Sequence, residues 1–363
     1  MKKVILSVCA LLTFVTGIKA QENKKVFSTP KLSGYGIGQY QYSGQEDAES
    51  NTFSLRLVRV SLDGTIFNDF AYRVQGQING NTSTLGNSPR LVDAYVEWKK
   101  YEFIKVKFGQ FKLPFTFENP MNPIDQGFFN YSQAVLALSN FSDRTGAVSS
   151  NGRDIGLQIQ GDLLKTSSGR SLLHYQLGVF NGQGINTKDV DNQKDIVGGF
   201  WVMPIEGLRI GAFGWTGSYA REGADGLVKV SKERYAISGE YLVNDWTFRA
   251  EYIHSTGFGF KTTYNEKEDL SDATINTANG DKADGFYALA IAPVVKKKLY
   301  VKARYDMYRS NGEWNSCKTL YDIGLNYLFN RNVQINASYS LVNDRKLEEH
   351  NYSMFDAQIS FRF

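Results

Sequence analysis

Residues 353–363 read Ser-Met-Phe-Asp-Ala-Gln-Ile-Ser-Phe-Arg-Phe, and this stretch decides the fold. Phe355, Ala357, Ile359, Phe361 and Phe363 fall on one parity, while Met and four polar side chains fall on the other. A period of two predicts a β-strand with one apolar and one wet face. Strands of transmembrane barrels show this alternation over about ten residues, apolar toward lipid and polar toward the lumen. We therefore expect the last strand of such a barrel; the alternative is the last strand of a secreted β-sandwich.

The N-terminus predicts export from the cytoplasm. Lys2 and Lys3 precede an apolar run over residues 4–18, and Ala20 follows it. This is the pattern of a secretory signal peptide, and the run is too short for a membrane-spanning helix. We expect a signal peptide over residues 1–20 and a transmembrane barrel domain over residues 21–363. An exported chain without a later long apolar run is either soluble outside the cytoplasm or a β-barrel.

Composition favours the barrel. Aromatic residues make up 14% of the 363 residues and Gly occurs 34 times, yet the mean hydropathy is only −0.35. Half-polar strands with aromatic girdles at the two membrane interfaces produce this combination. The formal net charge is +4, and three Lys of the predicted signal peptide account for most of it. The basic residues form no blocks, so we expect no nucleic-acid partner.

The period of two recurs along the whole chain. In residues 70–78, for example, Phe, Tyr, Val and Ile alternate with Arg and Gln. Counting all such runs gives a single antiparallel all-β barrel of about 16 strands with no helical domain. Short turns such as 243–246 alternate with long polar loops such as 257–284, as short periplasmic turns and long extracellular loops do in outer-membrane barrels. The weaker strand predictions in this count are 32–42, 53–67, 194–203 and 208–216.

One connection differs from the others. About forty residues lie between Lys112 and Gly152, and three prolines break any strand there. A long loop with its own apolar content is usually functional and packed against something. We expect residues 113–145 to fold into the lumen and narrow it; the alternative is a loop packed on the outer rim. The residues expected to mark this constriction loop are Pro114, Phe115, Glu118, Pro120 and Pro123.

The charges predicted to face the lumen nearly cancel, with nine basic and eight acidic side chains by parity. Anion selectivity would therefore require the bases to gather at the narrowest level, because rings of Arg or Lys select anions. A bulge near Leu57 would let both neighbouring arginines face the lumen. The residues expected to line or flank the constriction are Arg56, Arg59, Arg73, Lys105, Lys107 and Arg144.

Several segments resemble the phosphate-selective porin O/P family. Residues 109–118 read Gly-Gln-Phe-Lys-Leu-Pro-Phe-Thr-Phe-Glu and look like its strand-end segment. Residues 53–64 resemble its early arginine-bearing strand, residues 143–146 and 153–158 the segment after its long third loop, and residues 175–182 the next strand and turn. The resemblance spans residues 33–363 and implies a 16-stranded barrel, usually trimeric, that carries anions through a constriction of Arg and Lys. Phe361 and Phe363 likewise resemble the terminal signal by which outer-membrane barrels are recognised for assembly.

We expect an outer-membrane channel for passive diffusion of small hydrophilic solutes, with a preference for phosphate or other small anions. The alternatives are a substrate-specific channel for an organic anion or oligosaccharide, and a non-transporting surface barrel or adhesin. No nucleophile elbow, phosphate-binding loop or zinc-binding helix motif occurs. We therefore expect no enzyme activity, catalytic residue, cofactor or metal. The expected partners are outer-membrane lipids, the barrel-assembly machinery, small anionic or neutral solutes and further copies of the chain in a homotrimer.

Overall fold

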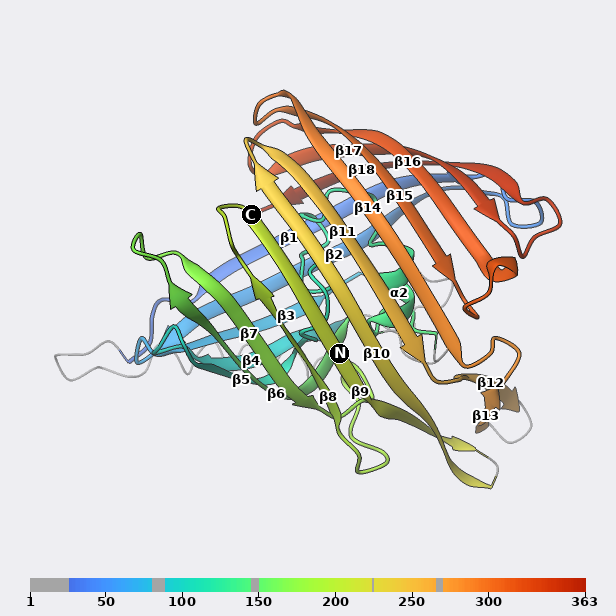
Figure 1. Cartoon of the computed structure of the whole chain (residues 1–363), viewed down its shortest axis with the longest axis horizontal. Coiled ribbons are helices and arrows are strands. Elements are labelled where there is room, and N and C mark those ends of the chain that lie inside the picture. Colours follow the sequence, from blue (N-terminus) through green and yellow to red (C-terminus); the bar gives the residue numbers. More distant parts are fainter. Residues whose placement is uncertain (1–25, 80–88, 145–149, 224, 266–269) are drawn as a thin grey trace, which may run out of the picture.

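The described part of the chain forms one closed antiparallel barrel of 16 strands (Figure 1). This confirms the predicted fold class and strand number. The predicted signal peptide lies outside the described residues. None of the helices within the described part is long and apolar enough to cross a membrane. The computed structural model describes residues 26–79, 89–144, 150–223, 225–265 and 270–363.

Neighbouring strands pair in chain order around the barrel, and β1 closes it against β18. One step is skipped: β11 pairs with β14, because β12 (Gly259–Asn265) and β13 (Leu270–Asn276) form a separate hairpin. The barrel strands are β1 (Lys31–Ser43), β2 (Ser50–Ile66), β3 (Phe70–Gln77), β4 (Arg90–Trp98), β5 (Lys105–Lys112), β6 (Arg153–Lys165), β7 (Ser171–Phe180), β8 (Asp195–Val202), β9 (Leu208–Gly223), β10 (Gly226–Val243), β11 (Trp246–Thr256), β14 (Lys282–Val295), β15 (Leu299–Arg309), β16 (Cys317–Leu328), β17 (Val333–Asp344) and β18 (Asn351–Arg362).

Alternation along the strands separates the two faces of the wall. On β18 the exposed Phe355, Ile359 and Phe361 face outward, whereas Asp356 and Ser360 are buried in the lumen. An unpaired strand edge in lipid costs several kcal/mol for each unsatisfied group, so only a closed sheet can present such an apolar exterior there. Alternate residues along each strand therefore face the lumen and the outside of the barrel.

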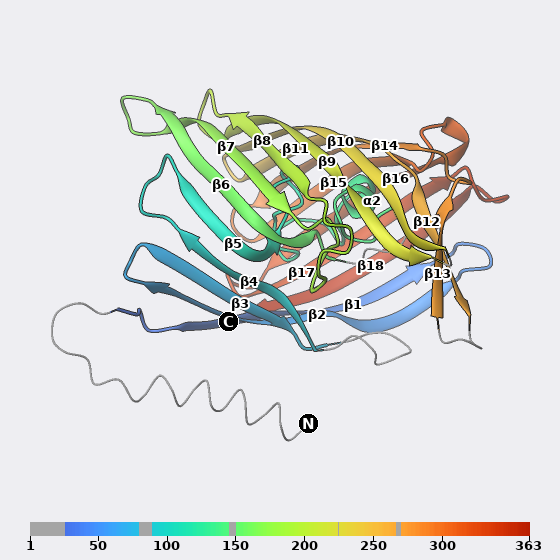
Figure 2. The same ribbon diagram turned by 90° about the horizontal axis from the view of Figure 1, so that it is seen from below.

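Short turns and long connections occupy opposite ends of the barrel. At the short-turn end, Asn244 and Asp245 join β10 to β11 with φ values of 50° and 69°. Positive φ at both central residues is the turn geometry that matches strand twist. The opposite end, called the long-loop end below, carries the β12–β13 hairpin (Figure 2).

The long connection contains a helix that the sequence did not predict. Helix α2 (Gln133–Leu138) is six residues long, and the side chain of Ser132 accepts a hydrogen bond from the backbone of Val135 at its start. Six residues make fewer than two helical turns, which is too short for a visible 3.6-residue period. Figure 2 shows α2 inside the barrel. A 3₁₀ turn, η1 (Trp314–Ser316), precedes β16.

Candidate functional site

The connection after β5 enters the lumen, as predicted for residues 113–145, of which residue 145 lies outside the described part. Phe115 and Phe117 are buried against the inner face of β9. Phe115 lies edge-on to Trp215, and Phe117 to Phe213, with ring centroids 5.5 Å apart in each pair. The connection therefore fills one side of the lumen with a packed aromatic cluster.

Acidic side chains of the wall hold the connection in place. Glu251 on β11 accepts hydrogen bonds from the backbone N–H groups of Phe117 at 2.9 Å and Glu118 at 2.8 Å. Asp306 on β15 accepts one from the backbone of Gln133 at 3.0 Å. Such hydrogen bonds satisfy backbone N–H groups that would otherwise be buried without a partner. These carboxylates bind the connection itself, so they are not free to attract cations into a pore.

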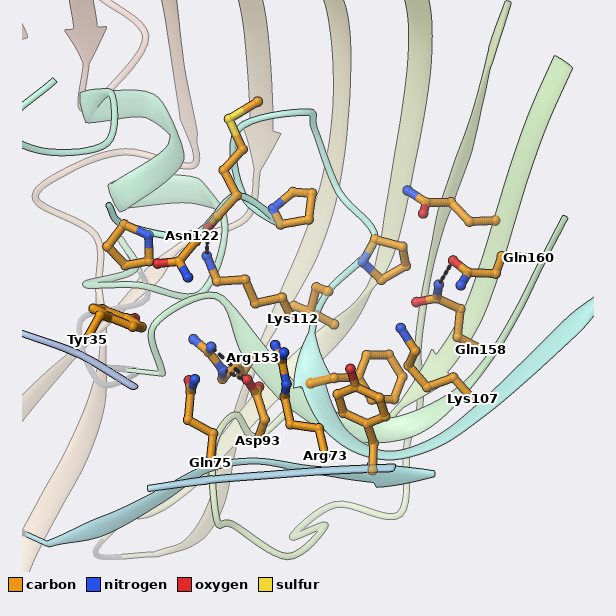
Figure 3. A pocket seen from close by; sticks show the side chains of 18 residues that line it. Tyr35, Arg73, Gln75, Asp93, Lys107, Lys112, Asn122, Arg153, Gln158 and Gln160 are labelled. Atoms are coloured by element: carbon orange, nitrogen blue, oxygen red, sulfur yellow. Dashed lines mark hydrogen bonds and ion pairs between the residues drawn. The ribbon is translucent and has the colours of Figure 1, made fainter. Parts of the chain in front are cut away.

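Two cavities remain on the other side of the lumen, between the connection and strands β1–β7. The first, of about 220 Å³, lies toward the short turns and is lined by Arg73 and Lys107 among others (Figure 3). The second, of about 270 Å³, lies toward the long loops. We infer that solute crosses the barrel where one cavity meets the other. The side chains that line both cavities are Lys112, Pro123 and Arg153.

Five basic side chains line the second cavity, and two of them, Lys112 and Arg153, also line the first; the five are called the basic cluster below. Four of them have no carboxylate partner among the described residues. Arg153 alone is ion-paired, with Asp93 at 2.6 Å, as Figure 3 shows. The basic cluster consists of Arg56, Arg59, Arg90, Lys112 and Arg153.

Neutral oxygen atoms hold most of the basic cluster. Arg59 donates to the hydroxyl of Tyr35 at 3.0 Å and to the side-chain oxygen of Gln77 at 3.2 Å. The Lys112 ammonium donates to backbone carbonyls of the connection, including that of Met121 at 2.6 Å. Neutral partners fix the positions of these groups and leave their positive charge uncancelled. Within the described part of the chain, the side chain of Arg90 makes no hydrogen bond.

A β-bulge brings two arginines of β2 to the same face. The pairing of β1 with β2 shifts between Ile37, which lies opposite Leu57, and Gly38, which lies opposite Leu55. Arg56 is the extra residue in this irregularity, and both Arg56 and Arg59 line the second cavity. The predicted bulge near Leu57 is thereby confirmed, and it explains how residues of opposite parity share the lumen.

The opposite wall carries bases that are neutralised by acids. There five lumen bases form ion pairs with acids of the wall or, for Arg234, with Asp143 of the connection. Most bases of this wall are therefore ion-paired, with Lys302 an exception among the described residues, whereas four of the five bases in the basic cluster are not ion-paired. These pairs are Lys232–Asp195 at 2.6 Å, Arg234–Asp143 at 2.7 Å, Arg249–Glu240 at 2.8 Å, Arg304–Asp322 at 2.8 Å and Arg309–Asp284 at 2.6 Å.

The residues predicted to form the constriction occupy different places. Arg73 and Lys107 line the first cavity but lie close to acids, at 2.6 Å from Asp63 and 3.5 Å from Glu97 respectively. Lys105 lies further toward the short turns and is 3.4 Å from Asp162; it lines neither cavity.

Arg144 and the residues predicted to mark the constriction loop also lie in different places. The guanidinium of Arg144 donates to backbone carbonyls of other long connections, including Gly280 at 3.1 Å, and it lines neither cavity. Pro114, Pro120 and Pro123 line the first cavity. Phe115 and Glu118 are buried within the packed connection. Phe361 and Phe363 are exposed on the outside of the barrel at its seam.

Three members of the basic cluster were not among the predicted site residues. Arg90, Lys112 and Arg153 stand at the first or last position of β4, β5 and β6. Strand ends are the least reliable part of a prediction from alternation, so parity assigned them no face. Lys112 and Arg153 flank the long connection, which was the available signal for these two; Arg90 follows the connection between β3 and β4 and had no such signal. Among the described residues, no group of three or more His, Cys, Asp or Glu side chains is arranged to hold a metal ion.

Comparison with known families finds one match. Residues 33–188 match the model of the family described as "Phosphate-selective porin O and P". The resemblance predicted from the motifs is confirmed over that part of the chain, which contains the entire basic cluster. A search of curated proteins finds no match.

Solved structures share the fold at low sequence identity. The anion-selective porin from Comamonas acidovorans is 13% identical with a TM-score of 0.64, over 92% of this chain and 99% of that chain. The trimer form of OmpT from Vibrio cholerae is 14% identical with a TM-score of 0.57, over 93% and 100%. OmpF from Salmonella typhi, in complex with daunomycin, is 13% identical with a TM-score of 0.60, over 92% and 97%. The described residues therefore have the fold of an outer-membrane porin.

Proposed function

We propose that this chain, which carries the sequence pattern of the phosphate-selective porin O and P family over residues 33–188, is an outer-membrane channel for passive diffusion of small anions. The observation that carries the proposal is the basic cluster, which lines the second cavity, reaches the first through Lys112 and Arg153, and contains one ion pair among five bases. The fold shared with an anion-selective porin is further support.

The basic cluster lowers the free energy of an anion where the path is narrow. An anion that sheds part of its water there meets guanidinium and ammonium groups already fixed by neutral partners. Such charges act more strongly in a confined, partly low-dielectric space than in bulk water. A cation at the same place is repelled. No bond is made or broken in this process, so we propose a channel without enzymatic activity.

Entry proceeds past Arg90 and the bulged Arg56–Arg59 pair at the long-loop end. The anion then passes Lys112 and Arg153, and leaves past Arg73 and Lys107, whose acidic neighbours weaken the attraction. A strong site followed by a weaker one suits conduction, because an ion that binds too tightly cannot leave.

We propose that phosphate competes with chloride for this path, because guanidinium groups match phosphate oxygens in a bidentate way. The test is ion substitution with the purified full chain in a planar bilayer. Inorganic phosphate added to a chloride solution should reduce the single-channel chloride current in a saturable way. If the chloride current falls only as much as the lower chloride concentration explains, phosphate does not compete with chloride.

We further propose that residues 1–20 are removed on export and that the barrel assembles as a homotrimer in outer-membrane lipids, with the help of the barrel-assembly machinery. The trimer form of OmpT, which shares the fold, supports this oligomeric state. The exposed apolar side chains on the outside of the strands support contact with lipid. Size-exclusion chromatography with light scattering in detergent should give three chains per particle, and a one-chain particle would contradict the trimer.

A further inference from the structure

We propose that the lumen contains a second solute chamber, built for small uncharged polyols and separate from the anion path. It has a volume of about 210 Å³ and lies between the connection and strands β14–β18 and β1, at the short-turn end. Pro123 lines both this chamber and the first cavity of the anion path. The connection around Pro123 therefore divides this end of the lumen in two. The inference rests on the proposed function only in taking the lumen as a path for solutes.

No basic side chain lines the chamber among the described residues. Among the described residues that line it, Asp125 is the one charged side chain, and it is ion-paired with Arg362 at 2.6 Å. The nearby Lys302 is buried, and its ammonium donates to the carbonyl oxygen of Gly127 at 3.1 Å. The donors of Lys302 are thus directed at Gly127 and Asn336, and the described lining of the chamber contains no basic side chain, in contrast to the anion path.

The amide side chains of the chamber leave their oxygen atoms free. The amide nitrogens of Asn326, Gln334 and Gln358 donate to backbone carbonyls of the connection at 3.0, 2.8 and 3.1 Å. None of the three amide oxygens accepts a hydrogen bond from a described residue, and that of Asn326 is buried. A buried acceptor without a partner is unfavourable. These oxygens favour a ligand that donates hydrogen bonds, such as a hydroxyl group, over an anion that can only accept them.

Apolar surface completes the chamber. Phe128, Ile37, Ile291 and the ring of Tyr300 line it beside the amides. Small-molecule sites typically combine an apolar lining with a few placed polar groups. The carbon backbone of a polyol fits the apolar side while its hydroxyls reach the amide oxygens. The anion path has the opposite polarity, because its basic cluster presents donors.

A substitution at Asn326 tests the chamber with the least disturbance of the surrounding hydrogen bonds. Its nitrogen donates to the Gly127 carbonyl, but that carbonyl also accepts from Lys302 at 3.1 Å and from Asn336 at 3.4 Å. Asn326→Leu therefore removes the free acceptor without leaving the carbonyl unpaired. Ser360→Leu is a second variant that narrows the chamber from β18.

The experiment is a liposome swelling assay with ribitol, an uncharged pentitol, using the full chain. Asn326→Leu should lower the rate of ribitol entry about fivefold, as expected for the loss of one neutral hydrogen bond. Ser360→Leu should lower it in the same direction. Neither variant should change the chloride current in a bilayer. The control is Lys107→Met in the anion path, which should alter ion selectivity and leave ribitol entry at the wild-type rate.

The outcomes separate this inference from the proposed function. If the wild-type channel excludes ribitol, the proposed polyol chamber is wrong. It is also wrong if both variants admit ribitol at the wild-type rate. If Asn326→Leu fails to fold, Ser360→Leu decides alone. Cation preference in the unmodified channel would contradict the anion path while leaving a ribitol effect of Asn326→Leu intact.

Discussion

Gly34 and Phe363 exchange two backbone hydrogen bonds of 3.0 Å across the seam between β1 and β18. The ring of Phe363 also covers Gly34 on the outside, because a β-carbon on Gly34 would stand 2.6 Å from its Cζ atom. Phe361 lies over Gly36 in the same way. The seam is thus closed by backbone hydrogen bonds between β1 and β18. Two aromatic rings also cover glycines on the lipid-facing side of the seam.

Substitution at the two seam glycines should have unequal effects. A β-carbon on Gly34 would also stand 2.7 Å from the backbone oxygen of Arg59, whereas one on Gly36 meets only the flexible ring of Phe361. Gly34→Ala should therefore destabilise the barrel by about 1–3 kcal/mol, the usual range for overpacking, and Gly36→Ala by less. Urea unfolding in detergent micelles measures the difference. Equal stability of the two variants would show that the close approach of Gly34 to the Arg59 backbone does not matter for the seam.

Deleting residues 361–363 should reduce assembly in the outer membrane. The deletion removes the pairing of Phe361 with both Gly36 and Val333, together with the two hydrogen bonds to Gly34. Each unsatisfied backbone group in lipid costs several kcal/mol. The amount of heat-modifiable barrel in isolated outer membranes is the measurement. Wild-type amounts would exclude a role of these residues in closure.

Asp143→Asn should loosen the connection inside the lumen. The Asp143 carboxylate receives two hydrogen bonds of 2.7 Å from Arg234 on β10, and both residues are buried. Breaking one partner of a buried pair typically costs about 3–5 kcal/mol, since the other charge is left behind. Single-channel current should become larger and noisier. Asp189→Asn is the matched control, because Asp189 pairs with the exposed Lys194 in another loop, and its current should match the wild type.

The same ion pair predicts how the channel responds to acid. Burial raises the pKa of Asp143, but the neighbouring Arg234 outweighs it, so the pKa of Asp143 lies below its ordinary value. A lowered pKa means that the pair contributes its full stabilisation above the ordinary value, about pH 3.9, and loses it as pH falls through the lowered pKa. In the wild-type channel, the larger and noisier current expected of Asp143→Asn should therefore appear only below about pH 3.9. Noise that already rises between pH 6 and 5 would contradict this assignment.

Alternation in the sequence predicted the wall of the barrel because the side-chain period of a strand is two. β18 and even the weaker strand predictions, such as 194–203 for β8 (Asp195–Val202), correspond to strands of the structure. Helix α2 was missed because six residues carry too little periodicity. The lumen location of the connection was predictable from its prolines and apolar content, but its anchoring to Glu251 was not, since 133 residues separate Glu251 from Glu118.

The candidate site was only partly predictable. Parity placed Arg73 and Lys107 in the lumen, and the predicted bulge placed Arg56 beside Arg59. Arg90 and Arg153 lie at strand ends, where a period of two assigns no face. The separation of paired from unpaired charge depends on which side chains meet across the barrel. A list of lumen charges in sequence order contains no such information.

The central claim is that the unpaired positive charge of the basic cluster makes the channel prefer anions. The most direct test is the reversal potential across a potassium chloride gradient for the wild type, Arg90→Gln and Lys105→Gln. Arg90 makes no hydrogen bond among the described residues, so its replacement removes charge with little other change. Lys105 is a lumen base outside the cluster, 3.4 Å from Asp162, and serves as the matched control.

A unit charge about 10 Å from the ion contributes roughly 0.4–1.7 kcal/mol between the dielectric constant of water and an effective value of about 20. The account predicts that the wild type prefers chloride over potassium, and that Arg90→Gln lowers this permeability ratio by about fourfold or more, because the charge attracts chloride and repels potassium by the same amount. Lys105→Gln should stay close to the wild type, and the effect of Arg90→Gln should shrink at high salt. Potassium preference in the wild type, or equal ratios in the wild type and Arg90→Gln at low salt, would contradict the account.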